Sequence, residues 1–180
     1  RANIHFASVD RPLKKLLITS STPNEGKSTM AVNLGVVIAQ NDQSTVLVDA
    51  DFRRARVLEY LGLPNRSGLS TMLAETPLVL EGHLQRVESL KLEVLPSGDN
   101  PPNPTELLGS VKMTRILDML SEHAEMVIID SPPLMVVSDA AVVATHVDGV
   151  LLVVKPGLTR VGAVKNSIDQ LRRAKANLLG

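Results

Sequence analysis

The sequence predicts an α/β domain with a mostly parallel sheet that is covered by helices on both faces. Short runs that are apolar throughout alternate along the chain with helical patterns. Strands buried on both faces of a parallel sheet have this composition. Polar and charged side chains follow directly after three of these runs. Because ligands of such sheets bind outside the carboxyl ends of the strands, this edge is the expected site.

The first half of the chain holds two apolar runs around a helical pattern. Ala31, Leu34, Val37 and Ile38 recur at a spacing that places them on one side of a helix. After the second run the pattern weakens, because glycine and proline interrupt it. The expected elements are strands at 15–19 and 45–49, a helix at 28–40, and short helices near 56–61 and 68–74.

The second half repeats this alternation after a loop. Residues 96–104 contain four prolines and a glycine, which is typical of a loop. Thr105 is placed to cap a helix whose apolar positions extend to Leu120. The further expected elements are strands at 92–95, 126–130 and 150–154, a short helix at 138–144, and a helix at 161–176.

Composition limits the class of protein. The 180 residues suit one domain with a sizeable core, residues 1–180. Lysine plus arginine and aspartate plus glutamate balance at 19 each, so no basic footprint for nucleic acid exists at the level of the whole chain. Cysteine is absent, which excludes disulfides and thiolate metal sites, and no apolar run approaches the ~18 residues of a membrane span. The chain begins without Met and stops just after a helical pattern, so we expect a domain cut at both ends.

Residues 20–29 form the stretch around which the chain is organised. They follow an apolar run, contain Gly26-Lys27-Ser28, and precede a helical pattern, which is the layout of a phosphate-binding P-loop. Backbone N–H groups at the opening of a helix lack intrahelical partners and bind anions. Lys27 would add a full charge near the phosphates, and the Ser28 hydroxyl would bind Mg²⁺. Ser21 stands where the usual pattern begins with glycine or alanine.

Carboxylates follow two other apolar runs. Asp130 ends one run in the Walker B layout, and Asp49 and Asp51 end another. Alternate residues of an extended chain face the same side, so Asp49 and Asp51 could approach one ion or phosphate. These carboxylates suit Mg²⁺ binding and a base that accepts a hydroxyl proton. Helix capping or a solvated strand end is the alternative for each of them.

Several stretches together resemble the bacterial tyrosine kinases, and the resemblance covers nearly the whole chain. Residues 19–29 resemble the family's P-loop, and residues 46–54 resemble its second motif, Walker A′. Residues 127–133 with 138–140 resemble its Walker B motif. Residues 68–70 and 98–108 resemble two further stretches of the family's sequences.

The resemblance implies a P-loop NTPase fold and an ATP-dependent, autophosphorylating protein tyrosine kinase. Such domains regulate the polymerisation and export of capsular or extracellular polysaccharide. They lie in the cytoplasm at the inner face of the cell membrane. Their partner is a membrane protein of the chain-length-determinant type, fused or separate. They phosphorylate tyrosines of a neighbouring subunit in a homo-oligomer.

The resemblance also implies the roles of the site residues, with ATP or ADP and Mg²⁺ as cofactors. The implied nucleotide-binding residues are Pro23, Asn24, Glu25, Gly26, Lys27, Ser28 and Thr29. The implied catalytic residues are Lys27, Asp49 and Asp51. The implied metal ligands are Ser28, Asp51 and Asp130. Among these, Asp51 is both a Mg²⁺ ligand and the expected base, and Asp49 supports it.

Two features depart from the family pattern. The family's tyrosine-rich tail is missing, and the single tyrosine, Tyr60, is expected to be a packed ring rather than a phosphorylation site. Residues 1–4 resemble only the end of the family's Glu-x-x-Arg-x-x-Arg oligomerisation motif. The arginine run at 53, 54 and 56 either holds an acidic partner loop, stabilises phosphate charge or is a solvated helix start. Lys155 and Arg160 are expected to be surface charges.

Two other functions fit the same motifs. One is a switch ATPase of the septum-positioning or plasmid-partition kind. Those proteins have a signature lysine five residues before the P-loop lysine, where this chain has Thr22. The other is a non-catalytic domain that binds nucleotide and regulates a membrane partner.

Overall fold

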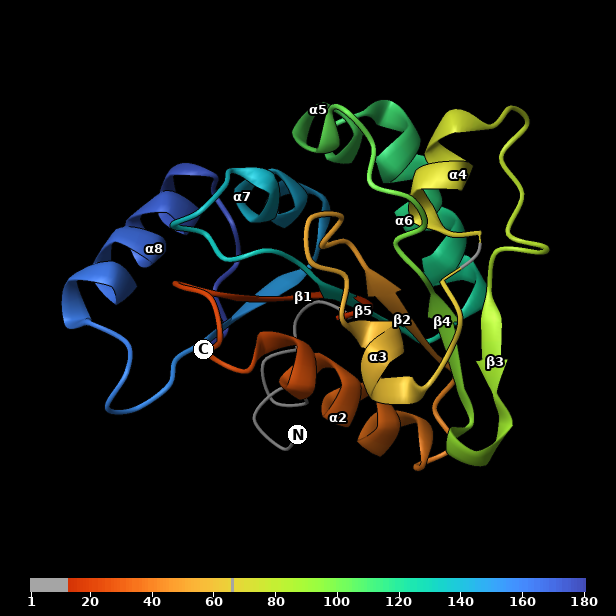
Figure 1. The fold of residues 1–180 in the computed structure, drawn as a ribbon, viewed down its shortest axis with the longest axis horizontal. Helices are drawn as coiled ribbons and strands as arrows, with labels where there is room; N and C mark the ends of the chain where they lie inside the picture. The colour runs from red at the N-terminus through yellow and green to blue at the C-terminus, as the bar shows by residue number, and fades with distance from the viewer. Residues whose placement is uncertain (1–12, 66) are drawn as a thin grey trace.

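The computed structural model describes residues 13–65 and 67–180, and the expected oligomerisation motif at 1–4 lies outside these residues. The described residues form a six-stranded sheet with the order β3-β4-β2-β5-β1-β6 (Figure 1). Neighbouring strands are parallel except for β3, which is antiparallel to β4. The strands are β1 Lys15–Ser20, β2 Thr45–Asp49, β3 Gln85–Val87, β4 Leu92–Leu95, β5 Met126–Asp130 and β6 Gly149–Val153.

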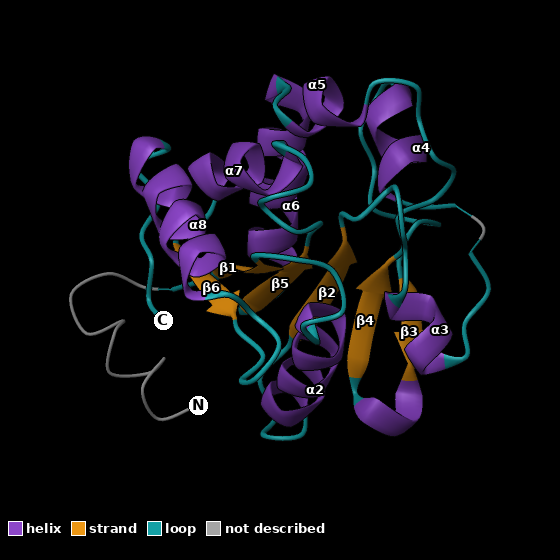
Figure 2. Ribbon diagram, turned by 60° about the vertical axis from the view of Figure 1, so that its left-hand side comes forward, coloured by secondary structure: helices purple, strands orange, loops and turns teal. Residues whose placement is uncertain are grey.

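Helices cover both faces of this sheet, as the sequence predicted (Figure 2). The α-helices are α2 Lys27–Ala39, α3 Val57–Leu61, α4 Leu69–Ala74, α5 Pro104–Leu108, α6 Val111–His123, α7 Asp139–Val143 and α8 Val161–Arg173. The described residues also form two short 3₁₀ helices, η1 Glu88–Leu90 and η2 Ala144–His146.

The core consists of two layers separated by the sheet. Leu16 and Ile18 of β1 pack with α2 and α3, whereas Leu17 between them packs with the layer that contains α4, α6, α7 and α8. Leu47 and Ile128 belong to the α2 side in the same way. Successive side chains of a strand point to opposite faces, so an apolar residue at every position fills both layers.

The structure corrects the predicted elements in two places. The single helix expected from Thr105 to Leu120 is wrong, because the chain forms α5 and α6 with Gly109 and Ser110 between them. The Ser110 hydroxyl accepts a hydrogen bond from the N–H of Met113 at 3.2 Å, which caps the start of α6. The short edge strand β3 was not predicted, because three half-exposed or exposed residues give no clear periodicity.

The backbone at Gly68 passes very close to the loop after β4. The N–H of Leu69 donates to the Pro96 carbonyl at 2.7 Å, and the N–H of Ser70 donates to the Ser97 carbonyl at 2.9 Å. A Cβ atom on Gly68 would lie 2.2 Å from the Pro96 carbonyl oxygen and 2.7 Å from the Gly98 nitrogen. This position therefore needs glycine for close approach, which fixes the loop at the carboxyl end of β4.

We expect Gly68→Ala to lower the free energy of unfolding by about 1 to 3 kcal/mol, because the added methyl must displace backbone atoms. Gly162→Ala is the matched control, since a Cβ atom there meets nothing within 4 Å. Urea unfolding of both variants measures the difference. Equal urea midpoints for the two variants would show that the close contact between Gly68 and the loop after β4 tolerates a side chain.

None of the helices in the described part of the chain is both long and apolar enough to cross a membrane.

Candidate active site

The candidate site lies where β1, β2 and β5 end side by side. Ile18 of β1 and Asp49 of β2 are both in register with Asp130, the last residue of β5. The loop that follows β1 therefore begins next to both carboxylates. The sequence predicted that these strand ends share one edge, and the register confirms it.

The loop after β1 has the backbone shape of an anion-binding turn. Asn24 has φ 66° and Gly26 has φ 94°, both in the left-handed region that favours glycine. Gly26 is the N-cap of α2 and supplies no side-chain hydrogen bond to the first turn. The free N–H groups at the start of α2 can therefore donate hydrogen bonds to phosphate oxygens.

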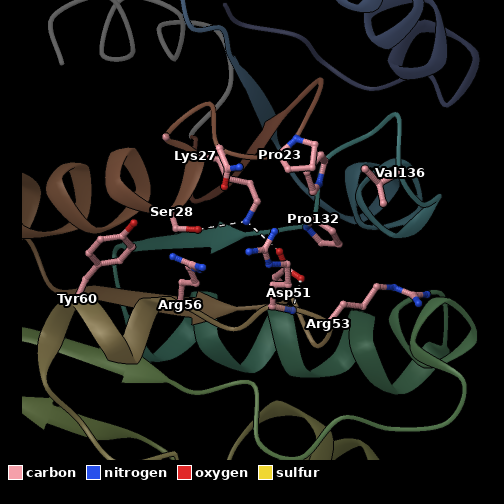
Figure 3. Close-up of a pocket in the computed structure, with 13 residues that line it drawn as sticks. Pro23, Lys27, Ser28, Asp51, Arg53, Arg56, Tyr60, Pro132 and Val136 are labelled. Atoms are coloured by element: carbon pink, nitrogen blue, oxygen red, sulfur yellow. Dashed lines mark hydrogen bonds and ion pairs between the residues drawn. The ribbon is translucent and has the colours of Figure 1, made fainter. Parts of the chain in front are cut away.

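Lys27 connects the loop to the carboxylates, as Figure 3 shows. Its Nζ atom lies 2.9 Å from Asp51 Oδ2, 3.1 Å from Ser28 Oγ and 3.5 Å from Asp130 Oδ2. Burial of the ammonium group opposes its charge, but Asp130 and Asp51 outweigh burial and raise the pKa of Lys27. Lys27 is thus a firmly charged cation held beside two acidic side chains.

Asp130 is fully buried and incompletely paired. Its Oδ1 atom has no hydrogen-bond partner among the residues that the structure describes. Burial raises the pKa of Asp130 to about 6, although the charge of Lys27 opposes this rise. A buried carboxylate oxygen without a partner needs a further ligand to offset its desolvation.

The oxygen atoms around Lys27 fit Mg²⁺. Mg²⁺ keeps several waters and is usually bound by one or two carboxylates together with phosphate oxygens. Ser28, Asp51 and Asp130 offer one hydroxyl and two carboxylates of this type. No group of three or more His, Asp or Glu side chains that could hold a metal alone occurs in residues 13–65 and 67–180. The donors therefore suit a metal that is bound together with a nucleotide.

Asp49 is buried and contacts backbone. Its Oδ1 atom accepts from the N–H of Asp51 at 3.2 Å and its Oδ2 atom accepts from the N–H of Val57 at 3.1 Å. Burial, together with the nearby charge of Asp130, raises the pKa of Asp49 to about 8. Asp49 thereby fixes the segment that carries Asp51 and the arginines, and its catalytic role stays a prediction.

A pocket opens beside Lys27. Its lining includes the loop residues Pro23, Asn24, Gly26, Lys27 and Ser28. It further includes Asp51, Arg53, Arg54, Arg56, Tyr60, Pro132, Pro133 and Val136. The side chains of Glu25 and Thr29 do not contribute to this lining, so their part in nucleotide binding stays a prediction.

The sequence did not single out part of this lining. Tyr60 was expected to be a packed ring, but it is 51% exposed and faces the pocket, so that expectation was wrong. Pro132 and Pro133 belonged to a matched motif without an assigned role, and Val136 lay outside every matched motif. The signal that could have found them is their position directly after β5, at the edge where ligands bind.

Glu25 anchors the loop from behind. Its carboxylate accepts from the N–H of Thr22 at 2.9 Å and from the Thr22 hydroxyl at 2.7 Å. It also accepts from the hydroxyl of Thr159, in the loop between β6 and α8. Burial of Glu25 works against its charge, but these hydrogen bonds lower its pKa. The ionised carboxylate thus ties the phosphate loop to a distant segment of the chain.

We expect Glu25→Gln to weaken nucleotide binding about tenfold, because an amide accepts fewer hydrogen bonds and the loop loses its fixed shape. Calorimetric titration with Mg·ADP measures this change. Thr159→Val removes one of the same hydrogen bonds and should weaken binding in the same direction. Thr145→Val is the matched control, because its hydroxyl donates to Val142, away from the loop. Unchanged nucleotide binding in Glu25→Gln would show that Glu25 does not determine the shape of the loop.

The fold and the site together define a class of protein. A Gly-Lys-Ser loop that opens a helix, with carboxylates at the neighbouring strand ends, is the arrangement of a P-loop nucleotide-binding protein. No protein-family model matches the chain. Individual relatives narrow the class further.

The chain belongs to the bacterial tyrosine-protein kinases. It is 41% identical to tyrosine-protein kinase YwqD of Bacillus subtilis (strain 168) over 180 residues, which is all of this chain and 76% of that protein. It is 37% identical to tyrosine-protein kinase Etk of Escherichia coli (strain K12), of which it spans 25%. The solved kinase domain of Etk matches with a TM-score of 0.93 over 98% of this chain and 69% of that one.

The switch ATPases are more distant. The structure of a ParA family ATPase from Chlorobium tepidum TLS matches with a TM-score of 0.76 at 15% identity, over 92% of this chain and 70% of that one. At this identity the similarity concerns the fold alone. The fold is therefore shared with this ATPase, whereas the relatives at 37% and 41% identity are tyrosine-protein kinases.

Proposed function

We propose that this site transfers the γ-phosphoryl group of Mg·ATP to the hydroxyl of a tyrosine. The observation that carries this proposal is the position of Lys27, whose ammonium group contacts Asp51 and Asp130 from the first turn of α2. The loop proposed to bind phosphate and the two acidic side chains thus lie next to each other. Phosphoryl transfer depends almost entirely on such positioning and on charge stabilisation.

The chain's own residues can divide the reaction between them. The N–H groups at the start of α2 would bind the β- and γ-phosphates, and Lys27 would stabilise the charge that develops on them. Asp51 would accept the proton of the tyrosine hydroxyl as its oxygen bonds to the γ-phosphorus. The bond between that phosphorus and the β-phosphate oxygen breaks, and ADP leaves. Ser28, Asp51 and Asp130 would hold Mg²⁺, which neutralises phosphate charge.

Phosphoryl transfer to a tyrosine peptide tests this proposal. The protein is incubated with Mg·ATP labelled at the γ-phosphate, with and without the peptide, and labelled phosphotyrosine and free phosphate are both measured. A kinase labels the peptide. Free phosphate without labelled peptide would identify a hydrolase of the switch type. Mg·ADP binding without either product would identify a nucleotide-binding regulator.

Thr22 argues against the switch ATPases. Where those proteins have their signature lysine, the Thr22 hydroxyl donates to Glu25 at 2.7 Å and so takes part in the loop's own hydrogen bonds. The loop is therefore completed here by a contact within the chain.

We further propose that the kinase acts at the inner face of the cell membrane, together with a chain-length-determinant type protein and neighbouring subunits, in polysaccharide export. The family to which the chain belongs supports this proposal. Coexpression with the cytoplasmic segment of such a membrane protein should raise the rate of tyrosine phosphorylation. A rate that does not respond to this segment would argue against the partnership.

A further inference from the structure

We propose that Arg54 and Arg56, with the apolar side chains across the pocket, bind the acceptor segment of a second polypeptide and select a tyrosine flanked by acidic residues. This inference rests on the proposed kinase function and adds the chemistry of its protein substrate. It concerns the part of the pocket outside the phosphate loop.

The three arginines after β2 differ in their partners. Arg53 Nε donates to Asp139 Oδ2 at 3.1 Å, and Asp139 is fully buried and also accepts from the Thr105 hydroxyl. The Arg53 side chain is therefore engaged in a contact within the domain. Figure 3 shows its side chain directed away from Lys27, whereas the Arg56 side chain lies between Tyr60 and Asp51.

Arg54 and Arg56 have no comparable partner. Within the described residues no ion pair involves Arg54, and Arg56, the N-cap of α3, reaches only the exposed Glu59 of that helix, at 4.0 Å. Such an exposed pair contributes little to stability. Because a guanidinium carries several N–H donors that fit a carboxylate, these two arginines can bind an acidic group. The chain as a whole carries no net charge, so this positive cluster is local.

Exposed apolar side chains lie on both sides of the reacting groups. Tyr60 is 51% exposed and Val136 is 56% exposed, and Figure 3 places them at opposite ends of the pocket with Lys27 and Asp51 between them. Val136 also lines a second groove, which extends to Arg173 of α8. An extended segment that crosses from Tyr60 to Val136 would therefore pass over Asp51, the proposed base.

Charge complementarity identifies the occupant. The positive part of this surface, at Arg54 and Arg56, favours carboxylates beside the tyrosine. The apolar side chain at the far end, Val136, contacts the rest of an extended chain. A neutral peptide would bind through the apolar contacts alone. Like charges brought together at an interface cost binding energy, so a basic peptide should be rejected.

Peptide binding and phosphoryl transfer together test the inference. Three fluorescent peptides contain one tyrosine flanked by glutamates, glutamines or lysines. Their affinity is measured by anisotropy and their phosphorylation by KM and kcat. We expect the wild-type protein to prefer the glutamate peptide over the glutamine peptide on the order of tenfold. The double variant Arg54→Glu and Arg56→Glu should reverse this order and prefer the lysine peptide.

Arg86→Glu is the matched control, because this exposed arginine lies on β3 and pairs with Glu88 at 3.0 Å. It should leave the preference unchanged. Equal affinities for the glutamate and glutamine peptides would overturn the inference, even if both are phosphorylated. A double variant that raises the KM for ATP and leaves peptide affinity unchanged would also overturn it, and would assign the arginines to the nucleotide. Charge-dependent binding without phosphorylation would support the surface and reject the kinase function.

Discussion

The Lys27→Met variant is expected to bind Mg·ADP at least about 100-fold more weakly than the native chain and to lose phosphoryl transfer. Lys27 is the one cation that contacts Asp51 and Asp130 in the described part of the chain. Removing a single preorganised hydrogen-bond donor from the place where transition-state charge develops costs about 10² to 10³ in rate, and Lys27 also carries a full charge. Calorimetry with Mg·ADP and transfer to the glutamate peptide measure the two effects.

The variant should remain folded, although its acidic groups will change. The charge of Lys27 lowers the pKa of Asp130 against the effect of burial, so its loss should raise that pKa further above about 6. Asp130 would then take up a proton near neutral pH. Lys165→Met is the control, because this side chain is exposed on α8. Equal Mg·ADP binding by Lys27→Met and the native chain would reject the phosphate-binding site proposed here.

The Asp51→Asn variant should keep nucleotide binding within a few-fold and lower phosphoryl transfer by about 10² to 10⁴. Asparagine is nearly isosteric, and its Oδ1 atom can still accept the hydrogen bond from the N–H of Arg54, which is 3.0 Å long. The loop should therefore keep its shape. The amide cannot take the proton of the tyrosine hydroxyl. Single-turnover transfer with bound Mg·ATP isolates this step from nucleotide binding.

Asp42→Asn is the matched control, because Asp42 is exposed and pairs only with Lys91, at 2.6 Å, in the described structure. It should leave transfer unchanged. Single-turnover transfer that is equally fast in Asp51→Asn and the native chain would remove Asp51 from the role of base. Loss of nucleotide binding together with transfer would assign Asp51 to the binding of Mg·nucleotide instead.

Local signals predicted most of the architecture. Each apolar run became a strand at nearly its predicted bounds, because burial on both faces requires apolar residues at every position. The predicted helix that proved wrong contained Gly109 and Ser110, where a break depends on how α5 and α6 pack. The edge strand β3 forms because it pairs with β4, and its own three residues have no pattern that predicts a strand.

The sequence by itself determined the phosphate loop and the acidic groups, because their chemistry follows from residue types at short spacings. Only the tertiary structure decided which side chains meet. Strand register aligned Asp49 with Asp130, and packing brought Glu25 to Thr159, 134 positions away. Packing likewise paired Arg53 with Asp139, 86 positions away, and left Arg54 and Arg56 facing the pocket. Such long-range contacts depend on how helices settle on the sheet, which local spacing does not encode.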